Sequence, residues 1–463
     1  MNPEYILRIT FIIFFTYFLI QSIFYLFFSV FGLFQSRRRT YQAKEEDSSV
    51  LFSTHFSLPV SIILPAQNEE KFIADSLKSI LTLDYPEFEI IVVNDGSTDR
   101  TLEILNDILL LEQFDKAYTD QFNSGKIHEV YKSVNYPHVT VISKTGGFNK
   151  AGAVNAALNF VRYKYICVID ADTIIEPGAI LKVMTQVEKD PDKIIGVGSY
   201  FGLANGFKIK DGKILEKSFS FNPLIAYQNL EYIRSFIATR LSGSAFNALS
   251  CVPGGFGVWR RDVVMQLDGY KTGFSSEDME LTFHAHDYMV KNKKDYQILM
   301  LPYYVGWTEG PSAIPSFITQ RNRWQRVVNE TLWRYRHMLF NPQYKWLGFF
   351  TFPYNLLFEV FGVFIEVASI GILTWAWLIK MLDVKIYLGL FLFMVLIQAF
   401  ISLSALFISI RDEKVFRFRY TCYLVVLSFF EFFLYRWIAI TAKISGTIDY
   451  CRGVRAYKQY KRK

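Results

Sequence analysis

The sequence predicts an α/β domain with a mostly parallel sheet and helices on both faces, joined to α-helical segments that cross a membrane. Short apolar runs alternate with helix-like stretches between residues 55 and 335, which is typical of a sheet built from parallel strands and crossover helices. Long apolar stretches flank this region. Because a helix needs roughly 20 apolar residues to cross a bilayer, these stretches predict transmembrane helices.

The first apolar stretch predicts an N-terminal transmembrane helix over residues 1–36. Residues 5–35 are nearly continuous apolar sequence, and Arg37, Arg38 and Arg39 follow at once. A cleaved signal peptide has a shorter apolar core and a basic cluster on the other side. By the positive-inside rule, residues 55–335 are then expected in the cytoplasm, and the chain is expected to be a multi-pass protein of the plasma (inner) membrane.

The C-terminal part is expected to hold about three further spans within residues 346–445, followed by a basic tail over residues 446–463. Apolar stretches return at about 347–380, 385–410 and 418–441. One span before the domain and three after it would leave the basic tail outside, against the positive-inside bias. Either the bias is broken or one stretch is re-entrant or interfacial, and the stretch with Pro353 is the candidate.

The distribution of charge indicates which partners the protein contacts, and the cysteines indicate whether it binds zinc. The formal charge of +7 gathers largely next to the spans, which predicts contact with anionic membrane lipids and argues against a nucleic-acid partner. The four cysteines include no CxxC pair. We expect them to be structural, and we expect no zinc site.

The soluble region is expected to contain a series of buried strands whose carboxyl ends carry polar residues. Ligands bind at these ends in open α/β sheets. Helices are expected from about Glu69, after a cap at Ser97 or Thr98, and after Gly146-Gly147. The polar segments 112–136 and 203–222 are expected to be surface insertions. The predicted strands are Val60–Leu64, Phe88–Val93, Val139–Ser143 and Tyr165–Ile169.

Three aspartates, Asp95, Asp170 and Asp172, fall at this edge of the predicted sheet. Because residues two apart in an extended chain point the same way, Asp170 and Asp172 are expected to face one ligand. A divalent cation that carries a nucleotide diphosphate takes one or two carboxylates, with phosphate oxygens in its remaining positions. The alternative is that these aspartates only form turns at strand ends.

Two further segments, Pro65–Glu69 and Asn94–Asp99, are candidates for nucleotide contacts at the same edge. Asp95 could accept hydrogen bonds from a uracil ring, with Gly96 permitting a tight turn; an ordinary Asp-Gly turn is the alternative.

Lys150 at a helix start could meet phosphate with help from the helix dipole. The alternative for Lys150 is a surface lysine.

The segment Ser275–Leu281 supplies a candidate general base. A carboxylate at Asp278 within hydrogen-bond reach could take the proton from a sugar hydroxyl as it attacks an anomeric carbon. The alternative is that these acids only stabilise a helix start. Two weaker candidates remain: the glycines of Pro253–Gly257 could let the backbone approach an acceptor closely, and Val305–Glu309 could line the same cleft.

The most specific segment is Gln320-Arg-Asn-Arg323-Trp324. Gln320, Arg323 and Trp324 share a helix face at this spacing. Arginine can hold pyrophosphate through two hydrogen bonds, and a sugar ring can lie on an indole face. The apolar positions that follow predict an amphipathic helix on the inner leaflet, and an interfacial helix without a catalytic role is the alternative.

Charged residues also occur within the predicted spans, at Glu359, Glu366, Glu431 and Arg436. Such residues are costly in lipid and are expected to face a bundle interior. They either pair with one another or line a path for a sugar chain. His284 and His286 have no third ligand nearby in the sequence, so we do not expect them to bind a metal.

The motifs around Asp95, Lys150, Asp170, Asp278 and Trp324 resemble, in order and coarse spacing, the processive membrane glycosyltransferases of family 2. This family includes cellulose, chitin-oligosaccharide, hyaluronan and poly-β-1,6-N-acetylglucosamine synthases. The resemblance covers residues 60–324 and extends to the membrane layout. It implies a GT-A fold, which is a Rossmann-like mixed sheet, together with a UDP-sugar donor and Mg²⁺ or Mn²⁺.

The resemblance also implies roles for individual residues. Asp172 with Asp170 would hold the metal and diphosphate, and Asp278 would be the base. Gln320, Arg323 and Trp324 would form the diphosphate and acceptor site. The acid motif departs from the family pattern in one position, because Ser276 stands where Thr is usual. We assign the donor nucleotide site to Glu69, Asp95, Lys150 and Asp170.

The main functional hypothesis is an inverting glycosyltransferase that polymerises a β-linked polysaccharide and translocates it between its spans. UDP-N-acetylglucosamine is the first candidate donor and the growing glycan the acceptor, with accessory export subunits as further candidate partners. The nearest alternative is a single transfer to a lipid or other acceptor. A non-catalytic sugar-nucleotide-binding or transport subunit is the third hypothesis, and it would not need the full set of Asp278, Gln320, Arg323 and Trp324.

Overall fold

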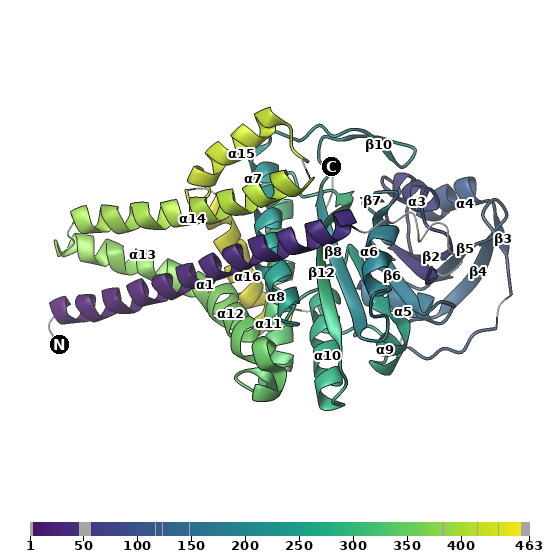
Figure 1. Ribbon diagram of the computed structural model, residues 1–463, viewed down its shortest axis with the longest axis horizontal. Helices are drawn as coiled ribbons and strands as arrows, with labels where there is room; N and C mark the ends of the chain where they lie inside the picture. Colours follow the sequence, from purple (N-terminus) through teal and green to yellow (C-terminus); the bar gives the residue numbers. More distant parts are fainter. Residues whose placement is uncertain are drawn as a thin grey trace. The chain divides into compact units, whose positions relative to one another are not determined.

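The computed structural model describes residues 3–45, 57–115, 117–122, 124–147, 149–381, 384–413, 415–433 and 435–454. The chain divides into two compact units, which are described separately (Figure 1). The sheet unit comprises Arg38–Ser220 and Gly243–Gly310, and the helical unit comprises Met1–Arg37, Phe221–Ser242 and Pro311–Lys463. The basic tail predicted over 446–463 falls outside the described residues from 455 onward.

The sheet unit is built on a mixed sheet. Over the described residues it is 10-stranded, in the order β3-β4-β5-β2-β1-β6-β11-β8-β12-β7. Strands β5, β2, β1 and β6 are parallel, and β11 joins β6 in the antiparallel direction. The strands are β1 (Val60–Ala66), β2 (Phe88–Asp95), β3 (Leu111–Gln113), β4 (Ile127–Ser133), β5 (Val139–Lys144), β6 (Tyr165–Ile169), β7 (Thr173–Ile175), β8 (Ile194–Leu203), β11 (Phe256–Arg260) and β12 (Gln297–Thr308).

Helices cover both faces of this sheet, as the sequence predicts. Buried residues of α3, α4 and α6 form one apolar core with alternate residues of β1, β2 and β6. Helix α5 contacts β1 and β2 and contributes nothing to that core, so it lies on the opposite face. The helices are α3 (Ile73–Leu81), α4 (Thr101–Leu109), α5 (Asn149–Leu158), α6 (Ala179–Val187), α9 (Arg261–Gln266) and α10 (Asp278–Lys291).

The four predicted strands are confirmed, and three details of the sequence prediction are wrong. Helix α3 begins at Ile73 rather than near Glu69. The cap of α4 is Arg100, not Ser97 or Thr98. The segment 112–136 is not only an insertion, because β3 and β4 extend the sheet beyond β5 in the antiparallel direction. The segment 203–222 does form a separate hairpin, with β9 (Lys208–Lys210) and β10 (Lys213–Glu216).

The helical unit contains the long apolar helices. Among the described residues, three helices are long and apolar enough to cross a membrane, Arg8–Arg38, Leu347–Leu378 and Tyr387–Ile410. A fourth candidate is a bent pair. Such helices are those of a membrane-associated protein. The elements are α1 (Pro3–Glu45), α7 (Pro223–Arg234), η1 (Ser235–Arg240), α8 (Leu241–Ala245), α11 (Ile314–Arg334), η2 (Arg336–Met338), η3 (Pro342–Tyr344), η4 (Leu347–Thr351), α12 (Phe352–Tyr354), η5 (Asn355–Phe361), α13 (Gly362–Leu378), α14 (Val384–Glu413), α15 (Phe418–Phe430) and α16 (Tyr435–Cys451).

The break in the C-terminal spans does not lie where the sequence suggests. The stretch with Pro353 is one candidate span, Leu347–Leu378, in which the π-helical η4 and η5 flank the proline. Wider turns of this kind accommodate the missing backbone N–H of proline. The bent pair is instead α15 with α16, at 65°, so the candidate for a broken span or re-entrant loop is the last stretch.

Helix α11 carries the Gln320–Trp324 motif and belongs to the helical unit. The apolar positions Val327, Leu332 and Tyr335 are buried. The neighbouring Asn322 donates to Ser445 Oγ at 2.8 Å and to Asp449 Oδ2 at 2.7 Å on α16. These three apolar positions therefore pack inside the protein rather than on lipid, and the position of the helix at the membrane interface stays a prediction.

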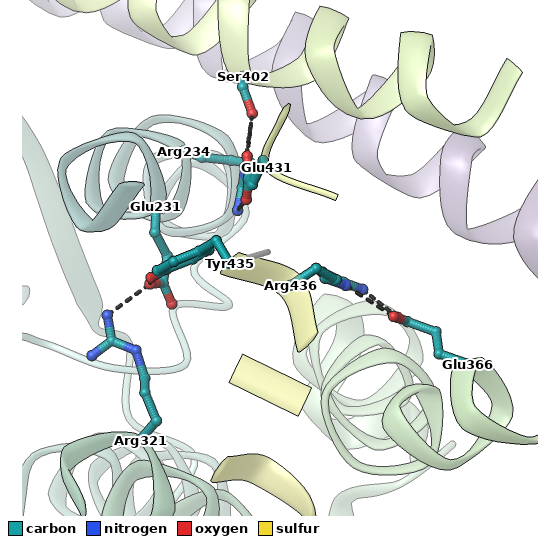
Figure 2. A network of polar contacts seen from close by, with 8 residues as sticks. All are labelled: Glu231, Arg234, Arg321, Glu366, Ser402, Glu431, Tyr435 and Arg436. Atoms are coloured by element: carbon teal, nitrogen blue, oxygen red, sulfur yellow. Dashed lines mark hydrogen bonds and ion pairs between the residues drawn. The ribbon is translucent and has the colours of Figure 1, made fainter. Parts of the chain in front are cut away.

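The charged residues of the predicted spans all have ion-pair partners, but only Arg436 and Glu366 pair with one another, as one of the two sequence interpretations expected. Glu431 lies at the bend between α15 and α16. Its carboxylate accepts hydrogen bonds from the two terminal guanidinium nitrogens of Arg234, at 2.9 and 3.0 Å. Arg436 pairs with Glu366 (Figure 2). Lys443 pairs with Glu359 at 2.6 Å. These pairs join helices that are far apart in the sequence.

Loss of one partner from such a pair is expected to destabilise the helical unit. The Glu431 side chain is only 3% exposed, and Arg234→Met would leave its charge uncompensated. Breaking a buried ion pair from one side costs about 3–5 kcal/mol, which we expect to appear as a lower melting temperature of the full-length protein in detergent. Arg100→Met is the matched control, because the Arg100–Glu103 pair is exposed. Equal melting temperatures for the two variants would contradict the prediction.

Candidate active site

The candidate site is built at the carboxyl ends of β5, β2, β1 and β6. Asp95 pairs in register with Lys144, and Asn94 pairs with Ala66. Asp170 follows directly after β6, which is hydrogen-bonded to the other side of β1. Since neighbouring strands lie about 4.8 Å apart, Asp95 and Asp170 stand two strand spacings from one another on one edge, as the sequence predicts.

The loop that contains Glu69 is tied to the loop that follows Asp95. Glu69 N donates to Thr101 Oγ1 at 2.9 Å. Asn68 N donates to Ser97 Oγ at 3.1 Å, and Asn68 Oδ1 accepts from Thr98 N at 2.8 Å. These hydrogen bonds hold the β1–α3 and β2–α4 loops together beside the strand ends, so Glu69 and Asp95 belong to one side of the site.

Asp95 is buried at the end of β2 and held from two directions. Its carboxylate pairs with the ammonium of Lys144, whose side chain is 0% exposed, and its backbone carbonyl accepts from Gln67 Nε2 at 2.9 Å. Burial raises the pKa of the Asp95 carboxyl, and Lys144 opposes that rise. Gly96 follows with φ +65°, which confirms the tight turn and favours glycine at this position.

Lys150 joins the two acidic motifs. Its Nζ lies 2.6 Å from Asp170 Oδ1 and 2.9 Å from Glu277 Oε1, and it donates to Gly254 O at 2.7 Å. A lysine ammonium has three donors, and these contacts use them. The surface-lysine alternative is therefore wrong. Direct contact of Lys150 with phosphate stays a prediction.

Charges within this cluster act on one another. Enclosure by protein atoms would lower the pKa of Lys150, but the carboxylates of Asp170 and Glu277 outweigh it and raise the pKa above the usual lysine value. Enclosure raises the pKa of the Asp170 carboxyl; Lys150 opposes the rise, and the negative charge of Asp172 adds to it. Lys150 therefore neutralises a concentration of negative charge.

The glycine segment Pro253–Gly257 lies against this cluster. A Cβ added at Gly254 would stand 3.1 Å from Glu277 Oε1 and 3.2 Å from Lys150 Nζ. A Cβ at Gly255 would stand 3.4 Å from Asp170 Oδ2. The structure shows that this backbone approaches the charged side chains of the cluster, and its predicted approach to an acceptor stays a prediction.

Helix α5 also holds the loop that precedes Asp278. Asn149 Nδ2 donates to the carbonyls of Thr272 and Phe274, each at 3.1 Å. Asn155 exchanges two hydrogen bonds with the Tyr270 backbone, both at 2.8 Å. Asn149 and Asn155 stand at the two ends of this segment of α5, and both hold the loop in place. Lys150, which lies between them, bonds to the Glu277 carboxylate.

Asp278 begins α10 and has one oxygen fixed. Its Oδ1 accepts from Met279 N at 2.9 Å and from Ser276 Oγ at 3.1 Å. Neither bond involves Oδ2, and the side chain is half-buried. Glu277, the N-cap residue, makes no side-chain cap bond, whereas Asp278 accepts from an N–H of the first helical turn. The role of Asp278 as a base therefore stays a prediction beside its role at the helix start. Ser276 supplies the hydroxyl expected from Thr.

The donor set fits a divalent cation only in combination with another ligand. Among the described residues, no group of three or more His, Cys, Asp and Glu could hold a metal ion. Asp170 and Asp172 provide two carboxylates, and hard cations take further oxygens from phosphate. The residues therefore fit a metal that binds together with a nucleotide diphosphate.

In the helical unit, the Gln320–Trp324 motif is organised around Arg321, which the sequence analysis missed. The Arg321 guanidinium lies 4.0 Å from the Trp324 ring centroid and 4.6 Å from that of Phe317. It donates to Gln320 Oε1 and to Glu231 Oε2, the latter at 2.7 Å. Spacing of three and four residues from Trp324 and Phe317 was the available signal.

Trp307, from a weaker candidate segment, and His286, which is not expected to bind a metal, both have structural roles. Trp307 is 1% exposed and donates its Nε1 hydrogen to Glu176 at 2.7 Å, so it does not line a cleft. His286 is fully buried, which lowers its pKa to about 4, and its ring nitrogens contact Tyr296 Oη and Leu249 O. The expectation that these histidines bind no metal stays a prediction.

Comparison with known families defines the class of protein. A family model described as Glycosyl transferase family group 2 matches residues 165–434, more than half of the chain, and one described as Glycosyl transferase family 2 matches residues 61–267. The chain belongs to glycosyl transferase family group 2 and is a membrane-associated glycosyltransferase. Its sheet unit has the GT-A fold.

The individual relatives share only a low sequence identity with this chain. The chain is 25% identical over 360 residues to the poly-beta-1,6-N-acetyl-D-glucosamine synthase of Staphylococcus epidermidis, covering 77% of this chain and 76% of that protein. For the synthase of the same name from Staphylococcus aureus (strain COL), the identity is 25% over 276 residues, covering 59% and 56%. A solved mannosyltransferase from Pyrobaculum calidifontis, in complex with GDP-Man and Mn²⁺, is 14% identical with a TM-score of 0.49, covering 94% of this chain and 99% of that chain.

Proposed function

We propose that this enzyme transfers N-acetylglucosamine from UDP-N-acetylglucosamine to a growing β-linked glycan at the cytoplasmic face of the plasma membrane. The observation that carries the proposal is the single cluster of Asp170, Lys150 and Glu277 beside Asp278. The names of the staphylococcal relatives support N-acetylglucosamine as the sugar and a polysaccharide as the product.

In this proposal each part of the sheet unit has a separate task. Asp95 and the Glu69 loop bind the nucleotide. Asp170 and Asp172 would hold Mg²⁺ or Mn²⁺ with the donor phosphates, and the ion would neutralise charge on the departing diphosphate. Lys150 and Gly254 hold Glu277, and thereby Asp278, in place.

The reaction is an inverting displacement. The acceptor hydroxyl attacks the anomeric carbon from the side opposite the diphosphate, and its proton passes to Asp278 Oδ2. The new bond joins the acceptor oxygen to the anomeric carbon, while the bond from that carbon to the diphosphate oxygen breaks and UDP leaves. Gln320, Arg323 and Trp324 are proposed to bind the diphosphate and acceptor.

A panel of UDP-sugars tests this proposal. Membranes that contain the full-length protein are expected to release UDP fastest from UDP-N-acetylglucosamine and to form a ladder or long chains on a sizing gel. One added sugar would favour the single-transfer alternative. Absence of UDP release from every sugar would contradict enzymatic transfer and favour a binding subunit.

A further inference from the structure

A buried ion pair joins Asp95, which was predicted as a site residue, to Lys144, which was not. The Lys144 side chain is 0% exposed and that of Asp95 is 4% exposed. The Lys144 ammonium also donates to Thr145 O at 2.8 Å. Lysine is almost never fully buried unless it is paired, and Asp95 supplies the negative charge that pairs with Lys144.

The charge of Asp95 decides which hydrogen bonds it can make. An ionised carboxylate only accepts hydrogen bonds, whereas a protonated one also donates. Burial raises the pKa of the Asp95 carboxyl above its usual value even with Lys144 beside it, and the hydrogen bond and charge of Lys144 limit that rise. Without an adjacent cation, a carboxyl in this position would shift toward its neutral form.

This difference separates two pyrimidine bases. Uracil carries a hydrogen on N3, which a carboxylate accepts. Cytosine has a lone pair on N3, so a carboxylate facing it would set two acceptors against each other. A neutral carboxyl group could donate to cytosine N3 and would lose this discrimination. Specificity of this kind depends on rejecting the wrong ligand as well as binding the right one.

We propose that Lys144 is a specificity-determining residue of the nucleotide site, because its ammonium keeps Asp95 a purely accepting carboxylate that selects uracil over cytosine. This inference rests on the proposed function, in which Asp95 meets the nucleotide base. It assigns Lys144 to base selection rather than to phosphate binding or catalysis. The register between β5 and β2 places Lys144 directly beside Asp95.

A matched control for Lys144→Met lies at the opposite end of strand β2. Glu89 begins the same strand β2 and is buried, and Arg162 Nε bonds its Oε2 at 2.7 Å. Arg162→Met therefore removes the cationic partner of a buried carboxylate in the same strand, but at the end opposite the site. Any effect common to Arg162→Met and Lys144→Met reflects general loss of an ion pair.

Calorimetric binding of UDP and CDP to the full-length protein in detergent, with Mn²⁺ present, tests the inference. The wild-type protein and the Arg162→Met and Lys144→Arg variants are expected to prefer UDP. In Lys144→Met the ratio of CDP to UDP dissociation constants is expected to fall by at least about tenfold, the equivalent of one pKa unit. If Lys144→Met does not fold, Lys144→Gln, which keeps a hydrogen-bond donor without the charge, is expected to show the same fall.

An unchanged ratio in the folded neutral variant would overturn the role of Lys144 while leaving the proposed function intact. A wild-type protein that binds neither nucleotide would overturn the proposed function and this inference together. A fall of equal size in Arg162→Met would also overturn the inference, since the effect would then not depend on the contact with Asp95.

Discussion

Replacement of Asp278 by Asn is expected to reduce sugar transfer by about 10³-fold, because general-base catalysis contributes roughly 10²–10⁴-fold. The amide has nearly the same shape and can still accept from Met279 N through its oxygen, as Asp278 Oδ1 does at 2.9 Å. It cannot take the proton of an attacking hydroxyl. UDP release from UDP-N-acetylglucosamine measures the rate, and calorimetric UDP binding is expected to stay within a few-fold of the wild-type value.

A matched control for this variant lies on the same helix. Asp287 is also a buried aspartate of α10, and it pairs with Lys291 at 2.8 Å. Asp287→Asn is expected to retain most of the transfer rate. If Asp278→Asn transfers sugar at the rate of Asp287→Asn, Asp278 is not the base, and another group must accept the proton.

Replacement of Lys150 by Met is expected to have the second largest effect. Its ammonium contacts Asp170, Glu277 and the carbonyl of Gly254. Without it, two carboxylates repel each other and the segment before Asp278 loses a tether. Misplacement of a catalytic group by about 1 Å can cost about 10²-fold, so we expect a loss of this order in kcat.

The kinetic form of the loss separates two roles for Lys150. A positioning role lowers kcat even at saturating donor, and Lys150→Arg is expected to restore part of it because the charge is retained. Direct phosphate binding, as the sequence predicts, would raise the KM for the donor and leave kcat near the wild-type value. Lys193→Met is the control, since Lys193 pairs with the exposed Asp295 at 2.8 Å on the same unit. Equal kcat in Lys150→Met and Lys193→Met would contradict the positioning role.

The predictable part of the site consists of residues whose position follows from local pattern. Asp95 and Asp170 end apolar strands, and the carboxyl ends of parallel strands meet at one edge. The structure places both there. Gly96 was predicted from its turn and adopts the expected positive φ. These inferences needed only the direction and periodicity of the chain.

The missed residues share a different property. Lys144 is the last residue of a strand, and nothing in its neighbourhood in the sequence distinguishes it from a solvated lysine. Arg321 was passed over in favour of Arg323, although it is Arg321 that lies on the Trp324 ring. Both are nearly or fully buried, and burial of a charged side chain depends on partners from other elements.

The sequence alone determined the class of this protein: the strand ends that carry the acids, the apolar helices and the order of the motifs. Only the tertiary structure decided which charges are partners. Lys144 meets Asp95 across 49 residues, and Arg234 meets Glu431 across 197. Strand and helix periodicity act over a few residues, whereas a buried ion pair forms wherever folding brings opposite charges together away from water. Helix α11, although next in sequence to the sheet strands, packs against α16 and therefore belongs to the helical unit.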